Sequence, residues 1–329
     1  MGLGYWGPNL ARNLAASKEC GLAGLCDRDE ARLELIGTGY PGVRQTGNLD
    51  SLLSDPGVEA VAIATPVDSH YDLARRCLEE GRHVLIEKPM TRSVYEAEAL
   101  IKLAEEKGLT LMVDHTFNYT GAVTKLKEIV ASGALGDILY WDSVRVNLGL
   151  FQHDVNVVWD LAPHDLSIMD YVLDAKPKSV QATGLAHYSD GLENIAYLTL
   201  RFAGDTIAHF HVNWLAPVKI RTTLIGGTKK MIVFNDMETV EKLKVYDKGV
   251  DVVKEREGIY KTLVQYRMGD MFAPHIENVE ALSREVAHFA RVVRGEEKSI
   301  SGGDAGLRVV RILEAAEQSI KDCGKEIRL

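Results

Sequence analysis

Short apolar runs alternate with helical patterns over the first third of the chain. Four runs are predicted as strands, at 21–26, 58–65, 84–86 and 111–113. The run at 58–65 is almost continuously apolar, as in a parallel strand buried on both faces. Between the runs, 70–80 and 93–107 have helical patterns; Ser93 and Glu96 open the second as a capping box, and Gly108 ends it. This alternation predicts a doubly wound parallel sheet within residues 1–120.

The pattern changes after about residue 120. A helix is predicted at 122–131, and two more, at 279–294 and 305–321, close the chain. Six strands are predicted between them, at 138–147, 179–186, 194–202, 206–214, 219–225 and 231–234. Strands that follow one another without crossover helices form largely antiparallel sheets. The sequence therefore predicts a second domain, at 121–329, of α+β type with a large open sheet.

The segment 206–214 alternates cleanly between two faces. Ile207, His209, His211 and Asn213 share one face. A sheet with helices on one side leaves the other side available, and an available face of this size is often an oligomer interface. His209 and His211 have the i, i+2 spacing of metal ligands, but no third ligand is evident, so no metal is predicted.

Composition narrows the class of protein. The chain has 329 residues, enough for about two domains, and is 46% hydrophobic and 26% charged, as soluble globular proteins are. It has no run of ~18 apolar residues and no basic-apolar leader, so neither a membrane span nor a signal peptide is expected. The net charge of −9 argues against nucleic acid or an anionic membrane as a partner. The four cysteines lack metal spacing, which favours reduced thiols in the cytoplasm.

A glycine motif, Gly2-x-Gly4-x-x-Gly7, stands at the start of the chain. In dinucleotide-binding folds the first glycine allows a tight turn. The second lets the pyrophosphate approach bare backbone, and the third brings the helix close to the strand. The N-terminus of that helix offers free N–H groups to the phosphates. Asp27 ends the next predicted strand, 20 positions after Gly7, where an acid holds the ribose hydroxyls. A chance glycine turn is the alternative.

Two details qualify this motif. Asp27 would repel a 2′-phosphate, which favours NAD, but Arg28 follows it and could bind that phosphate, so NADP stays open. The motif also needs a strand before it, and only Met1 precedes Gly2. We therefore expect the sequence as given to form a Rossmann sheet without its first, central strand. We also expect the true start of the chain to lie upstream of Met1, with several residues of apolar strand.

Polar residues follow three of the predicted strands. Thr65-Pro66, Glu87-Lys88-Pro89 and Asp114-His115 stand at their carboxyl ends. Prolines and polar residues often simply terminate strands. In an open α/β sheet, however, ligands bind beyond these ends, so Lys88 is expected to face the cofactor crevice.

The segment 159–166 carries a second set of candidates. Asp160 is a good helix N-cap, and Pro163 then falls in the first turn. Asp160 and His164 would lie one turn apart, where the helix dipole disfavours a charged imidazole. A neutral His can accept the proton of an alcohol. A capped helix with a structural His is the alternative.

These residue types fit one kind of chemistry. Oxidation of an alcohol by nicotinamide requires a hydride acceptor, which the cofactor supplies, together with a base and a polarising cation. His164 and Lys88 suit the last two roles, and Asp160 could orient or pair with one of them.

Taken in order, Gly2-x-Gly4-x-x-Gly7, Ala64-Thr65-Pro66, Glu87-Lys88-Pro89 and Asp160-x-x-x-His164 resemble the motifs of the Gfo/Idh/MocA family of oxidoreductases. The resemblance covers the whole chain except the absent first strand. It implies a Rossmann domain and an α/β domain whose open sheet is often buried between the subunits of a homodimer or homotetramer. It also implies NAD or NADP, and a sugar, sugar nucleotide or cyclitol that exchanges hydride at a ring hydroxyl.

The resemblance also implies roles. Lys88 would contact substrate and nicotinamide, Asp160 would bind substrate and aid Lys88, and His164 would be the acid/base. The expected cofactor-binding residues are Gly2, Gly4, Tyr5, Trp6, Gly7, Asp27, Arg28, Thr65, Pro66, His70, Glu87 and Lys88. The expected substrate-binding residues are Lys88, Asn118, Tyr119, Arg145, Asp160 and His164.

The wording of the motifs is most similar to members near nucleotide-sugar 3-dehydrogenases of the UDP-N-acetylglucosamine type. A nucleotide diphosphate would need cations. Arg145 and Lys219 are candidates only by their position on strands of the second domain, and both are as readily solvated.

Two other functions remain open. A nucleotide-binding sensor that has lost catalysis would need none of Lys88, Asp160 and His164, yet all three are present. The absent first strand favours a related hypothesis, in which the chain is a truncated product without function. Within the enzyme class, hydrolysis or elimination through a transiently oxidised sugar would give product without net NADH.

Overall fold

A computed structural model describes residues 1–149, 151–188, 191–253 and 263–329. It divides into two compact units: unit 1 comprises 1–120 and 279–314, and unit 2 comprises 121–278 and 315–329. The first segment of unit 1 ends at residue 120, near which the sequence pattern changes. Residues 279–314, which the sequence-based division assigns to the second domain, belong to the compact unit formed by the first.

Unit 1 contains two parallel sheets. β1 (Gly24–Cys26) pairs with β2 (Arg44–Thr46), and β4 (His83–Glu87) lies between β3 (Ala60–Ile63) and β5 (Leu111–Asp114). Its helices are α1 (Gly7–Ala16), α2 (Glu30–Gly37), α3 (Leu49–Leu53), α4 (His70–Glu79), α5 (Val94–Lys107) and α8 (Ala281–Val293), with short 3₁₀ turns η1 (Val67–Ser69) and η2 (Thr116–Tyr119). The predicted doubly wound parallel arrangement is confirmed.

Residues Met1–Leu3 lie between β1 and β3, where the first strand is expected. The Gly2 N–H donates to the Cys26 carbonyl at 2.8 Å, and the Ala64 N–H donates to the Met1 carbonyl at 2.8 Å. A cavity of ≈ 550 Å³ adjoins them. Apolar side chains of α1, β1, β3 and α8 contribute to its walls, among them Leu10, Leu25, Val61 and Phe289. Backbone hydrogen bonds of Met1 and Gly2 therefore join the two parallel sheets through the short segment that leads into the glycine loop.

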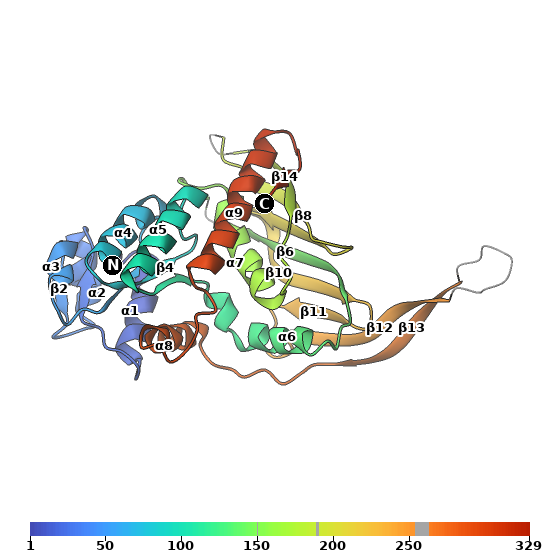
Figure 1. The fold of residues 1–329 in the computed structure, drawn as a ribbon, viewed down its shortest axis with the longest axis horizontal. Coiled ribbons are helices and arrows are strands. Elements are labelled where there is room, and N and C mark those ends of the chain that lie inside the picture. Colours follow the sequence, from blue (N-terminus) through green and yellow to red (C-terminus); the bar gives the residue numbers. More distant parts are fainter. Residues whose placement is uncertain (150, 189–190, 254–262) are drawn as a thin grey trace. The chain divides into compact units, whose positions relative to one another are not determined.

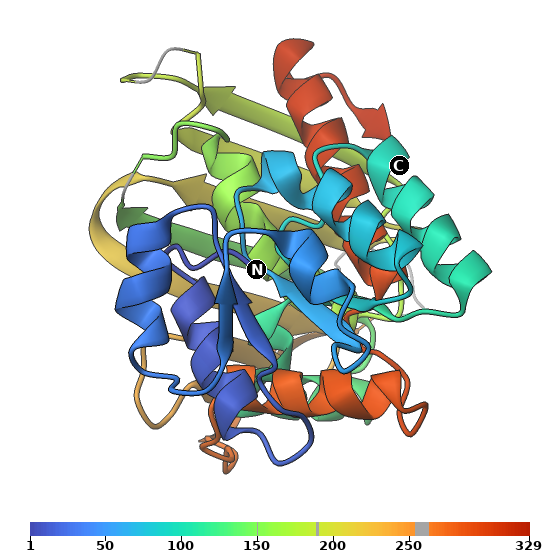
Figure 2. The ribbon, with the colours of Figure 1, turned by 90° about the vertical axis from the view of Figure 1, so that its left-hand side faces the viewer.

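Local signals in unit 1 act as predicted. The Ser93 side chain accepts the Glu96 N–H at the start of α5, and Gly108 ends this helix in the left-handed conformation, with φ of 65°. α8 joins unit 1 because its apolar stripe, which includes Val286 and Phe289, packs in one core with Leu85 and other buried residues. Figure 2 shows α8, in orange, beside α1, in dark blue.

Unit 2 is built on one large sheet. Its strands are β6 (Ile138–Leu148), β7 (Ser179–Leu185), β8 (Ile195–Arg201), β9 (Ile207–Asn213), β10 (Leu215–Gly227), β11 (Met231–Asn235), β12 (Leu243–Val253), β13 (Leu263–Phe272) and β14 (Ile327–Arg328). They lie in the order β13-β12-β11-β10-β6-β9-β8-β7-β14, and only β6 and β9 pair in parallel. The predicted, mostly antiparallel open sheet is confirmed (Figure 1).

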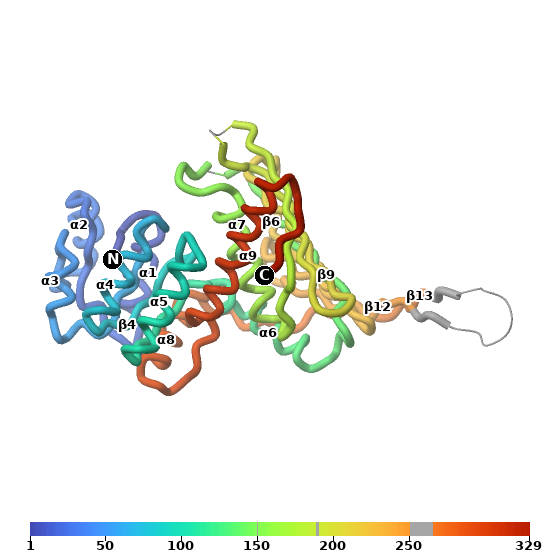
Figure 3. The backbone as a smooth tube through the Cα atoms, turned by 45° about the horizontal axis from the view of Figure 1, so that its top comes forward, coloured from blue at the N-terminus to red at the C-terminus, as the bar shows by residue number. Residues whose placement is uncertain are grey.

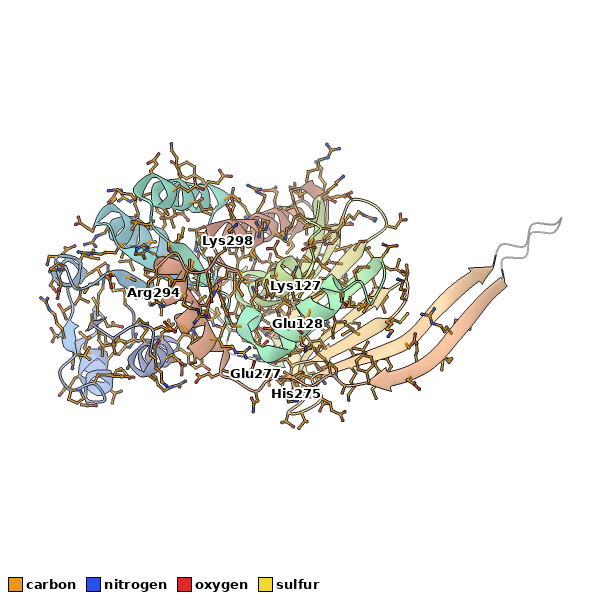
Figure 4. All side chains as sticks on the ribbon, turned by 60° about the horizontal axis from the view of Figure 1, so that its bottom comes forward. Lys127, Glu128, His275, Glu277, Arg294 and Lys298 are labelled. Atoms are coloured by element: carbon orange, nitrogen blue, oxygen red, sulfur yellow. The ribbon has the colours of Figure 1, made fainter. Side chains whose placement is uncertain are left out.

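Helices α6 (Gly121–Ala131) and α7 (Val157–Val172) belong to unit 2, and α9 (Gly303–Lys321) begins in unit 1 and ends in unit 2. α7 packs on the sheet at β6, β8 and β9. Large side chains such as Trp141, Phe210 and Trp214 are almost completely buried on this covered side. Figure 4 shows Lys127 and Glu128 on α6, with His275 and Glu277 on the segment that passes its start.

The other face of the sheet carries His209 and His211. Tyr197 stacks on His211, with ring centroids 4.5 Å apart. Across the described residues, no group of three or more His, Cys, Asp or Glu side chains is arranged to hold a metal ion. Over the same ranges, no helix combines the length and apolar character needed to cross a membrane.

The hairpin of β12 and β13 was not predicted. It extends from the edge of the sheet in Figures 1 and 3. Charged residues such as Lys244, Asp247 and Lys248 interrupt the apolar alternation of β12, which hides the period of two that identifies strands. Strand pairing, rather than local pattern, therefore defines this edge.

Candidate dinucleotide and acid–base sites

At two of the three glycines in the loop of unit 1, neighbouring backbone atoms leave no room for a side chain. Gly2 has φ of 84°, and a Cβ there would lie 2.6 Å from the Ala64 carbonyl oxygen. At Gly7 a Cβ would lie 2.0 Å from the Gly2 carbonyl oxygen. Both positions exclude any side chain, because no backbone atom can yield that far. These are the turn and the close helix–strand approach that the motif predicts.

Gly4 has different surroundings. The nearest atom to a Cβ there would be Arg32 Nη1, at 3.8 Å. Nothing inside the protein explains a glycine at this position, whereas a ligand against bare backbone does. α1 begins just after, with Trp6 as its N-cap residue and no side-chain cap. The N-terminal N–H groups of α1 therefore suit an anion, and Tyr5, 93% exposed, lies at the surface beside them.

Asp27 binds the glycine loop as well as ending β1. Its Oδ2 accepts the Leu3 N–H at 2.6 Å, and its Oδ1 accepts the Asp29 N–H at 2.9 Å. Each carboxylate oxygen can accept more than one bond, so these bonds leave capacity for a ribose hydroxyl. Asp27 is 9% exposed, and Arg28 beside it is exposed. Asp27 thus has a structural role, and its role at the ribose stays a prediction.

His70 is almost completely buried, at 1% exposure. Its Nδ1 lies 2.9 Å from the Pro89 carbonyl oxygen and its Nε2 lies 2.8 Å from the Thr65 carbonyl oxygen. Burial lowers the pKa of this imidazole. His70 therefore ties together the ends of β3 and β4, and the structure does not favour the expected direct contact with a cofactor. Thr65 and Pro66 remain accessible at the end of β3.

The ends of β4 and β5 bring Glu87, Lys88 and Asp114 together. Glu87 and Asp114 are register partners, and the Lys88 N–H donates to Glu87 Oε2 at 3.0 Å. Glu285, from α8, is 0% exposed, and neither of its carboxylate oxygens has a hydrogen-bond partner among the described residues. The sequence reasoning missed Glu285, although an acid in the middle of an apolar helical stripe is a recognisable signal.

In unit 2, the helix that carries the acid–base candidates begins earlier than predicted. Asn156, not Asp160, is the N-cap of α7, and its Oδ1 accepts the Val158 and Trp159 N–H groups, both at 3.1 Å. Asp160 lies within the first turn, and Pro163 lies inside the helix. Asn156 is the cap because the apolar residues Val157, Val158 and Trp159 are buried as helical residues.

This shift changes one step of the chemistry. His164 now lies beyond the first turn, and the helix dipole acts mainly within that turn. The dipole therefore does not account for a neutral His164. The i, i+4 spacing is unaffected, so Asp160 and His164, both partly exposed, share one face of α7. Trp214 Nε1 donates to Asp160 Oδ2 at 3.0 Å, which fixes the orientation of this carboxylate.

The remaining substrate candidates lie deeper. Arg145 is 4% exposed, and its Nε and Nη2 donate to Asp165 at 2.9 and 2.8 Å. A buried bidentate ion pair of this kind does not favour a substrate contact. Asn118 and Tyr119 of η2 are also buried, and the Tyr119 hydroxyl lies 2.9 Å from Ser301 Oγ. Lys219 is exposed at an irregular stretch of β10.

Comparison with known proteins agrees with both units. Residues 1–115 match the model of an oxidoreductase family with an NAD-binding Rossmann fold, and residues 123–233 match the GFO/IDH/MocA C-terminal domain. The UDP-N-acetylglucosamine 3-dehydrogenase of Acidithiobacillus ferrooxidans is 28% identical over 94% of this chain and 92% of its own. The scyllo-inositol 2-dehydrogenase (NADP(+)) of Bacillus subtilis is 27% identical over 89% of this chain and 85% of its own.

A solved structure of an oxidoreductase is also similar to this chain over most of its length. An oxidoreductase from Magnetospirillum magnetotacticum superposes with a TM-score of 0.80 and is 30% identical, over 95% of this chain and 96% of that one. The parallel Rossmann sheet and the large, mostly antiparallel sheet are those that the sequence predicts. The chain therefore belongs to the Gfo/Idh/MocA family of oxidoreductases and is an NAD(P)-dependent dehydrogenase with an NAD-binding Rossmann domain.

Proposed function

We propose that the protein oxidises or reduces a ring hydroxyl of a sugar nucleotide or cyclitol, with NAD as the hydride carrier. One observation carries the proposal: Asp160 and His164 share a partly exposed face of α7, and a buried indole orients Asp160. This arrangement serves proton transfer and hydrogen bonding to a hydroxyl, not structural capping, because Asn156 is the cap.

Each residue has a proposed role. Bound NAD supplies the hydride acceptor, and the glycine loop with Asp27 would hold its pyrophosphate and ribose. Lys88 would polarise the substrate oxygen and His164 would accept its proton, because transfer of a hydride leaves a proton to be removed. Asp160 would accept a hydrogen bond from a substrate hydroxyl, and its negative charge would offset the positive charge of Lys88. Asp27 favours NAD over NADP.

The proposed substrate class is inferred from the names of the two relatives described above. Those described above act on a sugar nucleotide and on an inositol, and both substrates present vicinal ring hydroxyls to the enzyme. A diphosphate would need cations, and Arg145 is engaged with Asp165. This favours a substrate recognised through its ring hydroxyls; of the two candidate cations, Lys219 is the exposed one.

A turnover assay tests the proposal. The purified chain is given NAD⁺ with UDP-N-acetylglucosamine, scyllo-inositol or free aldopyranoses, and NADH absorbance is followed. We expect turnover with at least one of them and a loss of about 10²–10⁴-fold in kcat for His164→Ala, the usual contribution of a general base. An unaffected His164→Ala would remove the proton-transfer role. Product without NADH would indicate elimination, and NAD binding without turnover on any substrate would indicate a sensor.

A further inference from the structure

The start of α7 is held by a side-chain amide that is paired at both ends. Asn156, which is 5% exposed, accepts the Val158 and Trp159 N–H groups with its Oδ1. Its Nδ2 donates to Glu193 Oε2 at 2.7 Å, and the Val157 N–H donates to the Glu193 carbonyl at 2.9 Å. Glu193 lies in the segment just before β8, so the cap of α7 is tied to a distant part of unit 2.

These contacts allow only one orientation of the amide. Backbone N–H groups only donate and an ionised carboxylate only accepts, so the amide oxygen must face α7 and the amide nitrogen must face Glu193. Without the carboxylate, the Asn156 side chain would be free to turn about its last torsion and to lose part of its capping. Glu193 therefore selects the orientation in which Asn156 caps the helix.

The position of the cap determines the position of Asp160. The Asp160 N–H donates to the Asn156 carbonyl at 3.1 Å, the bond that opens the helix. Asp160 therefore lies one turn after the cap, and its carboxylate meets the indole of Trp214. In a helix that began at Asp160 instead, this carboxylate would turn to the backbone N–H groups of its own helix.

The residue after Glu193 holds the other partner of this bond. The Trp214 N–H donates to the Asn194 carbonyl at 2.9 Å, and Asn194 is 0% exposed. Residues 193–194 thus bind the backbone at the start of α7 and the backbone of Trp214. One dipeptide therefore links the two residues that form the Asp160–Trp214 hydrogen bond.

We propose that Glu193 is a positioning residue for Asp160: it holds the Asn156 amide in its capping orientation, so that α7 starts before Asp160 and the Asp160 carboxylate is presented to Trp214 and to substrate. This inference rests on the proposed role of Asp160 at a substrate hydroxyl. It differs from a capping role of Asn156 alone, which requires no particular residue at position 193.

Replacement of one side-chain nitrogen by oxygen separates these two roles. Asparagine and aspartate are equally good helix caps, so capping alone predicts no effect of Asn156→Asp. The proposal predicts a loss, because the variant lacks the Nδ2 donor and places a second carboxylate beside Glu193. When Asn156→Asp is combined with Glu193→Gln, the amide and the carboxylate change places and the hydrogen bond is restored. Glu193→Gln alone keeps an acceptor and should resemble the unaltered chain.

The first measurement needs no substrate. The indole N–H resonance of Trp214, assigned by its loss in Trp214→Phe, reports the hydrogen bond with Asp160. We expect this resonance to move upfield in Asn156→Asp and to return in the double variant. Glu193→Leu should move it in the same direction, and this change affects a partly exposed side chain, so the core stays intact.

Two controls accompany this measurement. Trp6 of unit 1 is the internal reference, because its Nε1 donates to Asp114 and its resonance should not respond to changes in unit 2. Glu241→Leu is the matched variant, because Glu241 is an exposed acid of unit 2 that pairs with Lys244. It should leave the resonance of Trp214 in place.

Kinetics provide the second measurement. With a substrate that is turned over, Asn156→Asp should lower kcat/KM about tenfold, the usual effect of disturbing a hydrogen bond to a charged group. The double variant should recover most of this loss. NAD affinity should be unchanged in every variant, because the glycine loop belongs to unit 1.

The outcomes separate the failures. A Trp214 resonance that stays in place in both Asn156→Asp and Glu193→Leu, or no recovery in the double variant, overturns the positioning role of Glu193. Full turnover in Asn156→Asp despite a moved resonance overturns the presentation of Asp160 to substrate. If the unaltered chain turns over no substrate, the proposed function fails, and the resonance still decides whether Glu193 positions Asp160.

Discussion

Trp214 and Asp160 come from different elements of unit 2, and the indole Nε1 of the first donates to the carboxylate Oδ2 of the second at 3.0 Å. Trp214 is 1% exposed, and Phe151 packs on it with ring centroids 5.4 Å apart. A rigid, buried donor of this kind holds one oxygen of Asp160 in place and so fixes the orientation of the carboxylate.

Trp214→Phe keeps an aromatic ring but removes the indole N–H that donates to Asp160, together with some buried volume. We expect a fall of about tenfold in kcat/KM, because hydrogen bonds to charged groups contribute roughly 1.5–3 kcal/mol. The NAD affinity of unit 1 should not change. Steady-state kinetics and a separate NAD titration measure both quantities.

Trp141→Phe is the matched control, because Trp141 is equally buried and its Nε1 has no hydrogen-bond partner among the described residues. Equal losses in the two variants would mean that Trp214 acts through packing alone. In a double-mutant cycle, Trp214→Phe should have little further effect in an Asp160→Ala background.

Two glycines of one motif should respond differently to alanine. Gly4→Ala fits the protein, since its Cβ would meet no atom closer than 3.8 Å, so the variant should fold normally and lose NAD affinity. Gly7→Ala would place a Cβ 2.0 Å from the Gly2 carbonyl oxygen and should lower stability itself. Thermal unfolding and NAD titration of both variants check this; full NAD affinity in folded Gly4→Ala would contradict a pyrophosphate at the loop.

Asp27→Ala removes the acceptor of two backbone N–H groups as well as a ribose ligand. We therefore expect weaker NAD binding and some loss of stability, since an unsatisfied buried donor costs about 1–3 kcal/mol. Asp27→Asn separates the effects, because an amide oxygen still accepts one bond but does not repel a 2′-phosphate. The ratio of NAD to NADP affinity should fall in Asp27→Asn; an unchanged ratio would remove Asp27 from the ribose.

The ion pair of Arg145 and Asp165 should be critical for unit 2. Asp165→Ala leaves a buried guanidinium without its bidentate partner, which typically costs about 3–5 kcal/mol. Glu128→Ala breaks an exposed pair with Lys125 and should change the urea midpoint little. A small effect of Asp165→Ala would show that Arg145 has an alternative acceptor of equal quality.

The stability of unit 1 should fall as the pH rises. The folded state retains protons on Glu87 and Glu285 that the unfolded chain releases above its ordinary glutamate pKa of about 4.3. The unfolding free energy then declines by about 1.4 kcal/mol per pH unit for each retained proton, until the folded state ionises. Glu280 acts in the opposite direction, because bonds from Arg12 and Asn13 lower its pKa to about 2.

Urea unfolding at several pH values checks this direction. The Glu285→Gln variant should show a smaller decline than the unaltered chain between pH 5 and pH 8. A steeper decline in the variant would mean that Glu285 is ionised in the folded state.

Much of unit 1 was predictable because its signals are local. Ser93 and Gly108 delimit α5 through contacts within a few residues, and the glycine spacing identifies a loop whose geometry depends on neighbouring backbone. In the same way, the i, i+4 relation of Asp160 and His164 follows from helix geometry alone.

The parts that escaped prediction depend on contacts between distant residues. Glu285 is buried because α8 packs in one core with Leu85 and Met112, which lie far earlier in the chain, so no local pattern predicts its surroundings. Arg145 was a candidate phosphate ligand because of its position on a strand, but in the structure it donates two hydrogen bonds to Asp165 of α7. The start of α7 depends on which of two caps allows Val157 and Val158 to be buried, which is a question of packing.

The cavity beside Met1–Leu3 has a consequence for the response of unit 1 to pressure. The cavity of ≈ 550 Å³ is partly open to solvent, so only the part of it that excludes water disappears when the surrounding strands separate. Pressure favours the state of smaller volume, and internal voids are a main source of that difference. Hydrostatic pressure should therefore unfold β1 and β3 before the other strands of unit 1. A substitution that places a larger apolar side chain in the cavity wall should raise the pressure at which β1 and β3 unfold.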